Sequence, residues 1–292
     1  EKNMRIGTFV IEGSTQLGVI SDGGVQYLVS SEGWPKTMIE WIAAAEELED
    51  RYRSVKDTIE VVPIDNRCLT APIPKLLGNV MCLGKNYAAH AEETAGTGST
   101  SSVEAGYPLV FTKGTNTING PYGKIPYDSS VSSEIDWEVE LAVIIGRECI
   151  NVDVDDALSY VFGYTVLNDI SARDIQFRHQ QFYLGKSLDG SCPIGPWIVT
   201  SDEMDDPQYL DLRCWVNGEL MQESNTSDQI YTVAETISIF SKGHTLVPGD
   251  VIATGTPDGV GFVRQPPRFL VPGDVLESEV EDIGRMRNVV GN

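Results

Sequence analysis

Two glutamates, Glu138 and Glu140, flank a single valine and could share one face of a strand. Side chains alternate between faces along an extended strand, so both carboxylates would point the same way. Like charges this close are unfavourable unless a cation neutralises them or one carboxylate takes up a proton. Hard oxygen ligands suit Mg²⁺, Mn²⁺ or Ca²⁺ better than zinc. The alternative is a solvent-facing strand that happens to carry acids, and the pair alone leaves both interpretations open.

Asp169 offers a third carboxylate, near the start of residues 168–176. If a helical turn begins there, Arg173 and Gln176 follow at i+4 and i+7 on the same face, which would align an acceptor, a cation and an amide. The alternative is an N-terminal helix cap with an internal ion pair. Taken together with Glu138 and Glu140, Asp169 favours a metal site with three carboxylate ligands.

His90 and Glu93 lie one turn apart on a short segment that favours a helix. A histidine oriented by a carboxylate is a candidate general base. Residues 96–102, which are glycine, serine and threonine only, follow directly and predict a flexible loop that could close over a substrate. An exposed His–Glu pair without a catalytic role is the alternative.

Two further segments could contact an anion. Lys186 precedes a loop rich in proline and glycine, where it is either a surface residue or, beside a metal, a group that holds an enolate or carboxylate. Residues 254–261 contain three glycines, so their amides and the Thr256 hydroxyl could receive a substrate carboxylate. The alternative for this second segment is a simple turn between strands.

The elements that must position these side chains are mostly strands. Asn217-Gly218 and residues 21–24 are typical of hairpin turns, and residues 38–55 predict one amphipathic helix. This balance favours a strand-rich α+β fold around a rolled or barrel-like sheet. Prolines between residues 63 and 77 predict a small N-terminal unit at residues 1–74 and a main domain at residues 75–292.

Composition excludes several classes of partner. The chain has 292 residues and a net charge of −22, so electrostatic repulsion opposes binding to nucleic acid or an anionic membrane surface. Its five cysteines lack CxxC spacing, which argues against a zinc site or a disulfide framework. No apolar run is long enough to cross a bilayer. We therefore expect a soluble, cytoplasmic protein, although a targeting sequence could precede Met4.

Five separated motifs resemble the fumarylacetoacetate hydrolase family over about residues 75–290. They are Gly84-Lys85-Asn86-Tyr87 with His90 and Glu93, residues 137–141, residues 168–174, Lys186, and Thr254-Gly255-Thr256-Pro257. The resemblance implies a mixed β-sandwich roll that is usually dimeric. One position departs from the pattern, because Gly190 stands where several hydrolytic members carry threonine.

The resemblance also implies roles for the candidate residues. Glu138, Glu140 and Asp169 become ligands of Mg²⁺ or Mn²⁺. His90 and Glu93 become a lid dyad that activates water. The substrate and transition-state contacts become Arg173, Gln176, Lys186 and Thr256.

The resemblance implies a small anionic 2-oxo acid as substrate and, because the dyad is intact, hydrolysis of a C–C bond in an acylpyruvate. Decarboxylation of oxaloacetate is the close alternative, because the same enolate chemistry supports it without water attack. The same enolate chemistry could also support isomerisation or hydration of 2-oxo acids. A further alternative, from a different functional class, is a metal-stabilised binding or structural protein that has lost turnover.

Overall fold

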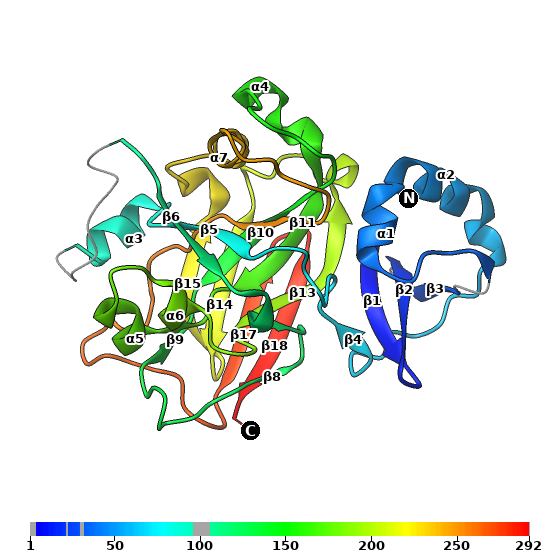
Figure 1. The fold of residues 1–292 in the computed structure, drawn as a ribbon. Helices are drawn as coiled ribbons and strands as arrows, with labels where there is room; N and C mark the ends of the chain where they lie inside the picture. The colour runs from blue at the N-terminus through cyan, green and yellow to red at the C-terminus, as the bar shows by residue number, and fades with distance from the viewer. Residues whose placement is uncertain (1–3, 22, 30–31, 96–105, 292) are drawn as a thin grey trace.

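The computed structural model describes residues 4–21, 23–29, 32–95 and 106–291. Two β-sheets pack face to face in the main body, and short helices cover their edges (Figure 1). Parallel and antiparallel neighbours occur in both sheets. The strand-rich α+β fold with a mixed β-sandwich, predicted from the sequence, is therefore confirmed.

The larger sheet has eleven strands and runs in the order β3-β2-β1-β13-β11-β10-β16-β5-β6, with β4 paired to β1 and β7 to β13. Its strands are β1 Arg5–Ile11, β2 Ser14–Ser21, β3 Gly24–Leu28, β4 Leu69–Thr70, β5 Val80–Gly84, β6 Leu109–Lys113, β7 Ile118–Asn119, β10 Val139–Ile145, β11 Val161–Asn168, β13 Cys192–Thr200 and β16 Val251–Ala253. The centre of this sheet carries the candidate site.

The second sheet has five strands in the order β15-β14-β17-β18-β8. They are β8 Lys124–Ile125, β14 Asp211–Val216, β15 Glu219–Asn225, β17 Val275–Val280 and β18 Gly284–Val290; a separate pair joins β9 Ile135–Asp136 to β12 Ser171–Ala172. Asn217 and Gly218 both have positive φ between β14 and β15, as the predicted Asn-Gly hairpin requires.

The two faces of β10 contact different parts of the core. Val139, Leu141 and Val143 belong to one buried cluster with Leu212 and Leu276 of the second sheet. The intervening residues Ala142 and Ile144 belong to a second cluster that includes the N-terminal helices. By the same alternation, Glu138 and Glu140 lie on the face turned away from the second sheet, as the sequence predicted.

The helices are short and lie at the ends and edges of the sheets. They are α1 Met38–Ala43, α2 Ala45–Val55, α3 Ala88–Glu93, α4 Val154–Ala157, α5 Arg173–Arg178, α6 Tyr183–Lys186 and α7 Val233–Phe240, with 3-10 turns η2 Lys56–Thr58, η4 Thr115–Thr117, η5 Leu158–Tyr160, η6 Ser201–Glu203 and η7 Thr226–Asp228. None of the helices in the described ranges is long and apolar enough to cross a membrane.

The single helix predicted over residues 38–55 is wrong, because the structure divides it into α1 and α2. Thr37 caps α1 through a reciprocal capping box with Glu40. Ala44 then leaves helical geometry at φ −130° and ψ 31°. No glycine or proline marks this break, so no local signal in the sequence predicts it.

The N-terminal strands join the larger sheet directly. β1 pairs antiparallel with β13, with Arg5 opposite Val199 and Ile6 opposite Ile198. Figure 1 shows α1 and α2 beside these strands, at one side of the molecule. The division between residues 1–74 and 75–292 stays a prediction.

Glu49 of α2 should make stability depend on pH. Burial and the neighbouring Asp202 raise the pKa of Glu49 to about 7 from about 4.5, although Arg53 opposes them. The folded state therefore keeps a proton that the unfolded state loses above about pH 4.5, and stability falls as pH rises towards 7. Glu49→Gln removes the charge that is unfavourable at pH 8, so we expect it to stabilise the protein at that pH. The expected gain is only about 1 kcal/mol, or about 2 °C in melting temperature, because solvent screens this half-buried group.

Thermal unfolding of the Glu49→Gln protein at pH 4.5 and pH 8 checks this prediction. The exposed Glu46→Gln on the same helix is the matched control and should change little at either pH. An equal gain at both pH values would show that Glu49 acts through packing rather than through its charge.

Candidate active site

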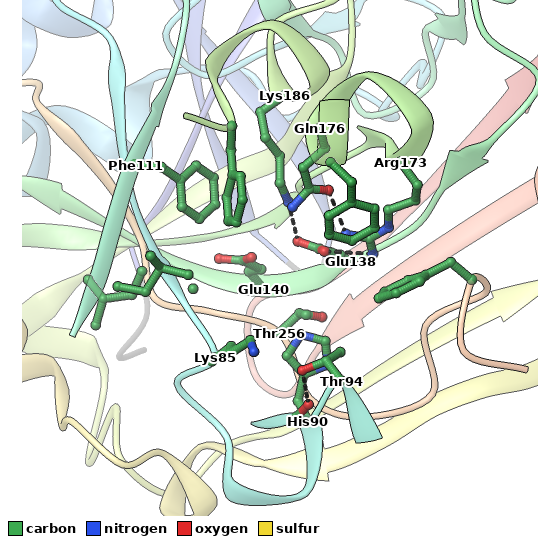
Figure 2. A pocket seen from close by; sticks show the side chains of 16 residues that line it. Lys85, His90, Thr94, Phe111, Glu138, Glu140, Arg173, Gln176, Lys186 and Thr256 are labelled. Carbon is green, nitrogen blue, oxygen red and sulfur yellow. Dashed lines mark hydrogen bonds and ion pairs between the residues drawn. The ribbon is translucent and has the colours of Figure 1, made fainter. Parts of the chain in front are cut away.

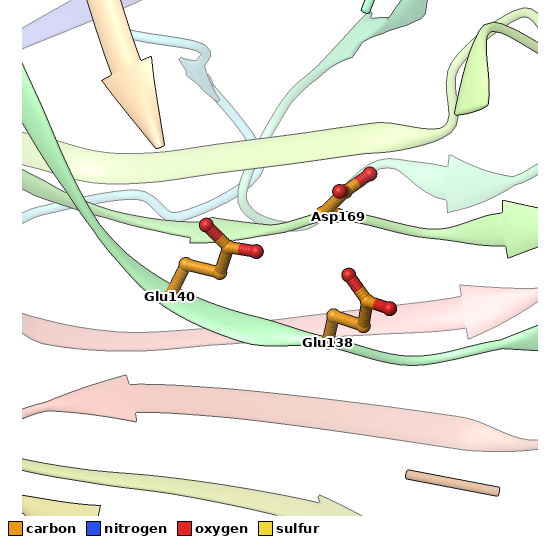
Figure 3. Close-up of side chains that lie close together, drawn as sticks. All are labelled: Glu138, Glu140 and Asp169. Atoms are coloured by element: carbon orange, nitrogen blue, oxygen red, sulfur yellow. The ribbon is translucent and has the colours of Figure 1, made fainter. Parts of the chain in front are cut away.

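Three buried carboxylates meet at the centre of the larger sheet (Figure 3). Glu138 directly precedes β10, Glu140 is the second residue of this strand, and Asp169 directly follows the end of β11. The antiparallel pair β10–β11 fixes their register, and the Asp169 amide donates to the Glu138 carbonyl at 2.8 Å. One oxygen from each carboxylate lies within 4.8 Å of the other two. The structure therefore brings together the three residues that the sequence predicted as metal ligands.

The predicted helical turn from Asp169 is wrong. Asp169 lies between β11 and β12, and α5 begins only at Arg173, with Ala172 in the cap position and no side-chain cap. Arg173 and Gln176 do share one face of α5, where Arg173 Nη1 donates to Gln176 Oε1 at 3.0 Å. Asp169 reaches the same site through strand pairing rather than through helical spacing.

Buried cations contact two of the three carboxylates. Lys186 Nζ lies 2.7 Å from both Glu138 Oε2 and Asp169 Oδ2. Lys113 Nζ lies 2.8 Å from Asp169 Oδ1, and Arg173 Nη2 lies 2.7 Å from Glu138 Oε1. Burial disfavours the charge on Lys186, but Asp169 and Glu138 outweigh it and raise the pKa of this lysine. Lys186 is therefore a stable ammonium at neutral pH.

Of the three predicted metal ligands, Glu140 is the one whose negative charge most needs a further cation to neutralise it. Its carboxylate accepts the Gly255 amide at 2.7 Å, and within the described parts of the chain no lysine or arginine forms an ion pair with it. Burial, Asp169 and Glu138 raise the pKa of Glu140 well above its ordinary value. A divalent cation among these oxygens would stabilise the ionised form, so the residues present fit such an ion.

The charge balance of the site also fits an anionic ligand. Within the described ranges, four buried carboxylates of the site face four buried cations, so their formal charges balance; they are Asp136, Glu138, Glu140 and Asp169 against Lys85, Lys113, Arg173 and Lys186. Addition of a divalent cation would leave two positive charges. Because buried charge is costly, that state favours binding of an acid.

His90 lies across the pocket from Lys186 (Figure 2). His90 Nδ1 lies 2.8 Å from Glu93 Oε1, and both Glu93 oxygens accept the Gly259 amide, at 3.2 and 3.1 Å. Both helix α3 and the loop that follows β16 therefore fix the pair. The flexible loop predicted at residues 96–102 lies outside the described residues.

The loop after β16 does bind carboxylates through its amides, but they are the protein's own. The Gly255 amide donates to Glu140, the Gly259 amide to Glu93, and the Gly261 amide to Asp136 at 2.7 Å. One short segment thus holds three carboxylates: the candidate metal ligand Glu140, the acid Glu93 of the predicted dyad, and Asp136, the partner of Arg173. Its predicted function as a cradle for substrate carboxylate stays untested.

Thr256 lines the pocket, but its hydroxyl already has two partners. It donates to the Val139 carbonyl at 2.9 Å and accepts from the Gln222 amide at 2.8 Å. Arg173 is similarly engaged, since it contacts Asp136, Glu138 and Gln176. Direct substrate contact by Thr256 and Arg173 stays a prediction, and the structure adds a positioning role for both.

The sequence did not predict two buried residues that contact the candidate site. Lys113 is completely buried at the end of β6, and Asp136 accepts from Arg173 Nε at 2.9 Å. Asp136, Glu138 and Glu140 alternate, so the pattern that predicted the pair could have included Asp136. A lysine soon after the apolar run of residues 109–111 was the available signal for Lys113.

The structure gives a reason for glycine at position 190. Its φ is +65°, in the left-handed region that favours glycine. A Cβ atom there would also lie 3.0 Å from Pro126 Cδ. A threonine at this position would therefore require a different path for the loop after Lys186.

Comparison with known proteins identifies the family. Residues 79–291 match the family model described as fumarylacetoacetate (FAA) hydrolase C-terminal. The chain belongs to the fumarylacetoacetate hydrolase family. It is 45% identical over 223 residues to oxaloacetate tautomerase YisK of Bacillus subtilis (strain 168), covering 76% of this chain and 73% of YisK. The resemblance carried by the five motifs is thereby confirmed.

Solved structures in the same family share the whole fold. Fumarylacetoacetate hydrolase EaFAH from psychrophilic Exiguobacterium antarcticum matches with a TM-score of 0.85 and 37% identity, covering 99% of each chain. Maleylpyruvate hydrolase from Sphingobium sp. SYK-6, solved with manganese(II) and pyruvate, matches with a TM-score of 0.81 and 30% identity, covering 99% of this chain and 100% of the hydrolase. Family relatives therefore include both tautomerases and hydrolases.

Proposed function

We propose that this protein is a divalent-metal-dependent tautomerase that interconverts the keto and enol forms of a small 2-oxo acid, with oxaloacetate as the first substrate to test. The observation that carries the proposal is the arrangement of one pocket. Glu138, Glu140 and Lys186 line one side, with Asp169 clustered beside the two glutamates, and His90, which contacts Glu93, lines the other. The identity to a relative named oxaloacetate tautomerase supports this choice over hydrolysis.

The proposed reaction moves one proton from carbon to oxygen. Glu138, Glu140 and Asp169 would hold Mg²⁺ or Mn²⁺, which would supply positive charge to stabilise negative charge that develops on the substrate. His90 takes the proton from C3, the electron pair of the C3–H bond forms the C2–C3 double bond, and the π pair of the C2 carbonyl moves to its oxygen. The protonated His90 then returns the proton to that oxygen. Glu93 engages Nδ1 of His90, so proton exchange with the substrate falls to Nε2. No water adds to the substrate, in contrast to hydrolysis.

The other residues hold these groups in place. Lys186 adds a second positive charge beside the enolate, because its ammonium contacts both Glu138 and Asp169. Arg173 bridges Asp136 and Glu138 and so fixes the orientation of Glu138. The pocket is small, about 40 Å³, which corresponds to about three water positions, and it is partly open to solvent.

Hydrolysis of an acylpyruvate is the second candidate, and the intact His90–Glu93 pair favours it, because the same base could activate water. Decarboxylation of oxaloacetate requires no such base. The cytoplasmic location and the homodimer stay predictions that accompany either candidate.

One set of assays separates these reactions. We expect the metal-loaded protein to accelerate the decay of the ultraviolet absorbance of enol-oxaloacetate by at least about 100-fold, the lower range of general acid–base catalysis. Coupled detection of pyruvate reports decarboxylation, and release of acetate from acetylpyruvate reports hydrolysis. Rapid acetate release without any effect on enol decay would replace the tautomerase by a hydrolase.

A further inference from the structure

Lys186 lies at the end of a helix that cannot fix its position alone. α6 has four residues, and no side chain caps its N-terminus. Isolated helices this short are not stable in water, so the position of α6 depends on contacts with other segments. Figure 2 shows the Lys186 side chain extending towards Glu138, where its ammonium lies 2.7 Å from Oε2. The segment that holds the end of α6 therefore controls where this charge lies.

Residues 113–119 run beside the loop that follows α6. They extend from the end of β6 through η4 to β7, and β7 pairs in parallel with the start of β13, where Ile118 lies opposite Cys192. Hydrogen bonds join this segment to the loop from Lys186 to Gly190. The two segments are far apart in the sequence, so only the folded chain brings them together.

Lys113 holds the buried end of the loop. Its side chain is completely buried, and its ammonium donates to the Lys186 carbonyl and, at 3.0 Å, to the Ile170 carbonyl. The same ammonium lies 2.8 Å from Asp169 Oδ1. Lys113 thus fixes the backbone of Lys186 close to the carboxylate that the Lys186 side chain contacts.

Asn116 holds the exposed end of the loop. Its side-chain amide donates to the Ser187 carbonyl at 3.0 Å and to Asp189 Oδ1 at 2.6 Å. Its backbone carbonyl accepts from the Gly190 amide at 3.2 Å. Asn116 is itself exposed and is not one of the residues that line the pocket. It can therefore affect a bound ligand only through the residues that it holds.

We infer that Asn116 is a positioning residue, which holds the Lys186 ammonium, through the loop backbone, beside a ligand bound at the three carboxylates. This inference rests on the proposed function, in which Lys186 supplies positive charge beside an enolate, and adds a residue outside the pocket that sets the position of that charge. The hydrogen bonds of Asn116 go to residues 187–190, whereas pairing between β10 and β11 holds the carboxylates. Loss of Asn116 should therefore weaken binding of an anion and spare the metal.

Oxalate, a planar dianion that resembles the enolate of a 2-oxo acid, tests the inference without turnover. We expect calorimetry at saturating Mn²⁺ to show that Lys186→Met weakens oxalate by about 10- to 100-fold, as for a lost charged contact. Asn116→Ala should weaken oxalate by about 3- to 10-fold, as for one or two neutral hydrogen bonds, and should change Mn²⁺ affinity by less than about twofold. The exposed neighbour Thr115→Ala is the matched control and should change neither affinity.

A double variant separates positioning from a general effect on folding. If Asn116 acts through Lys186, Asn116→Ala should weaken oxalate no further in protein that already carries Lys186→Met. Ser187→Ala offers an independent check, because it removes the hydroxyl that accepts the Gly114 amide at 3.0 Å. It should also weaken oxalate only while Lys186 is present.

Three outcomes would overturn the inference. They are oxalate binding that does not depend on Lys186, an equal effect of Asn116→Ala with and without Lys186, and a loss of thermal stability in Asn116→Ala with native oxalate affinity. If Asn116→Ala weakens oxalate through Lys186 but the native protein does not tautomerise oxaloacetate, the proposed function fails and the positioning role of Asn116 stands.

Discussion

Glu140→Gln is expected to lower the affinity for Mg²⁺ or Mn²⁺ by at least about 100-fold and to abolish turnover. Loss of groups that merely orient metal ligands costs about 10- to 100-fold, so a direct ligand should cost at least the upper end. Glutamine has nearly the same size, and its carbonyl oxygen can still accept the Gly255 amide. Isothermal titration with Mn²⁺, together with the enol-decay assay, measures both effects.

The same substitution should not destabilise the metal-free protein. Burial, Asp169 and Glu138 raise the pKa of Glu140, so the ionised acid is unfavourable there and a neutral amide avoids that cost. Thermal unfolding should therefore lose its dependence on metal while the metal-free transition is retained. Exposed Glu148→Gln, just beyond the end of β10, is the control. Metal binding of native strength in Glu140→Gln would remove Glu140 from the ligand set.

The reasons why parts of this site were predictable lie in short-range geometry. Alternation along β10 placed Glu138 and Glu140 on one face, and helical spacing placed His90 and Glu93 together. Both patterns depend only on residues a few positions apart. The structure shows both pairs as expected, with the Glu138 and Glu140 carboxylates in one cluster and His90 bonded to Glu93.

Asp169 shows the limit of prediction from residues that are close together in the sequence. Its expected helical relation to Arg173 was wrong, yet it reaches Glu138 because β11 pairs with β10. Strand pairing between distant segments is not encoded in local spacing. Lys113 is similar, since its contact with Asp169 joins the end of β6 to a residue that follows β11, far along the chain.

The carboxylate contacts of the loop after β16 were also beyond local prediction. Its glycines indicated amides open to an anion, and that chemistry is present at Gly255, Gly259 and Gly261. The sequence could not show which anions would arrive, because Glu93, Asp136 and Glu140 come from three other elements. A motif thus predicts a type of contact more securely than it predicts the partner.

His90→Gln is expected to lower kcat for enol–keto interconversion by about 10²- to 10⁴-fold, the usual contribution of a general acid or base. Metal affinity should change by less than about threefold, because His90 contacts Glu93 rather than the three carboxylates. Stopped-flow enol decay and Mn²⁺ titration measure the two quantities separately. His244→Gln, at an exposed position, should leave both unchanged.

Glu93→Gln distinguishes a dyad from a lone base. Glutamine can still accept from His90 Nδ1 and from the Gly259 amide, so orientation is retained while the negative charge is lost. We expect a smaller loss of kcat, about 10- to 100-fold, and a double variant no slower than His90→Gln alone, since the two residues act as one unit. Additive losses would mean that Glu93 acts independently, and a large loss of metal affinity in His90→Gln would make His90 a ligand instead of the base.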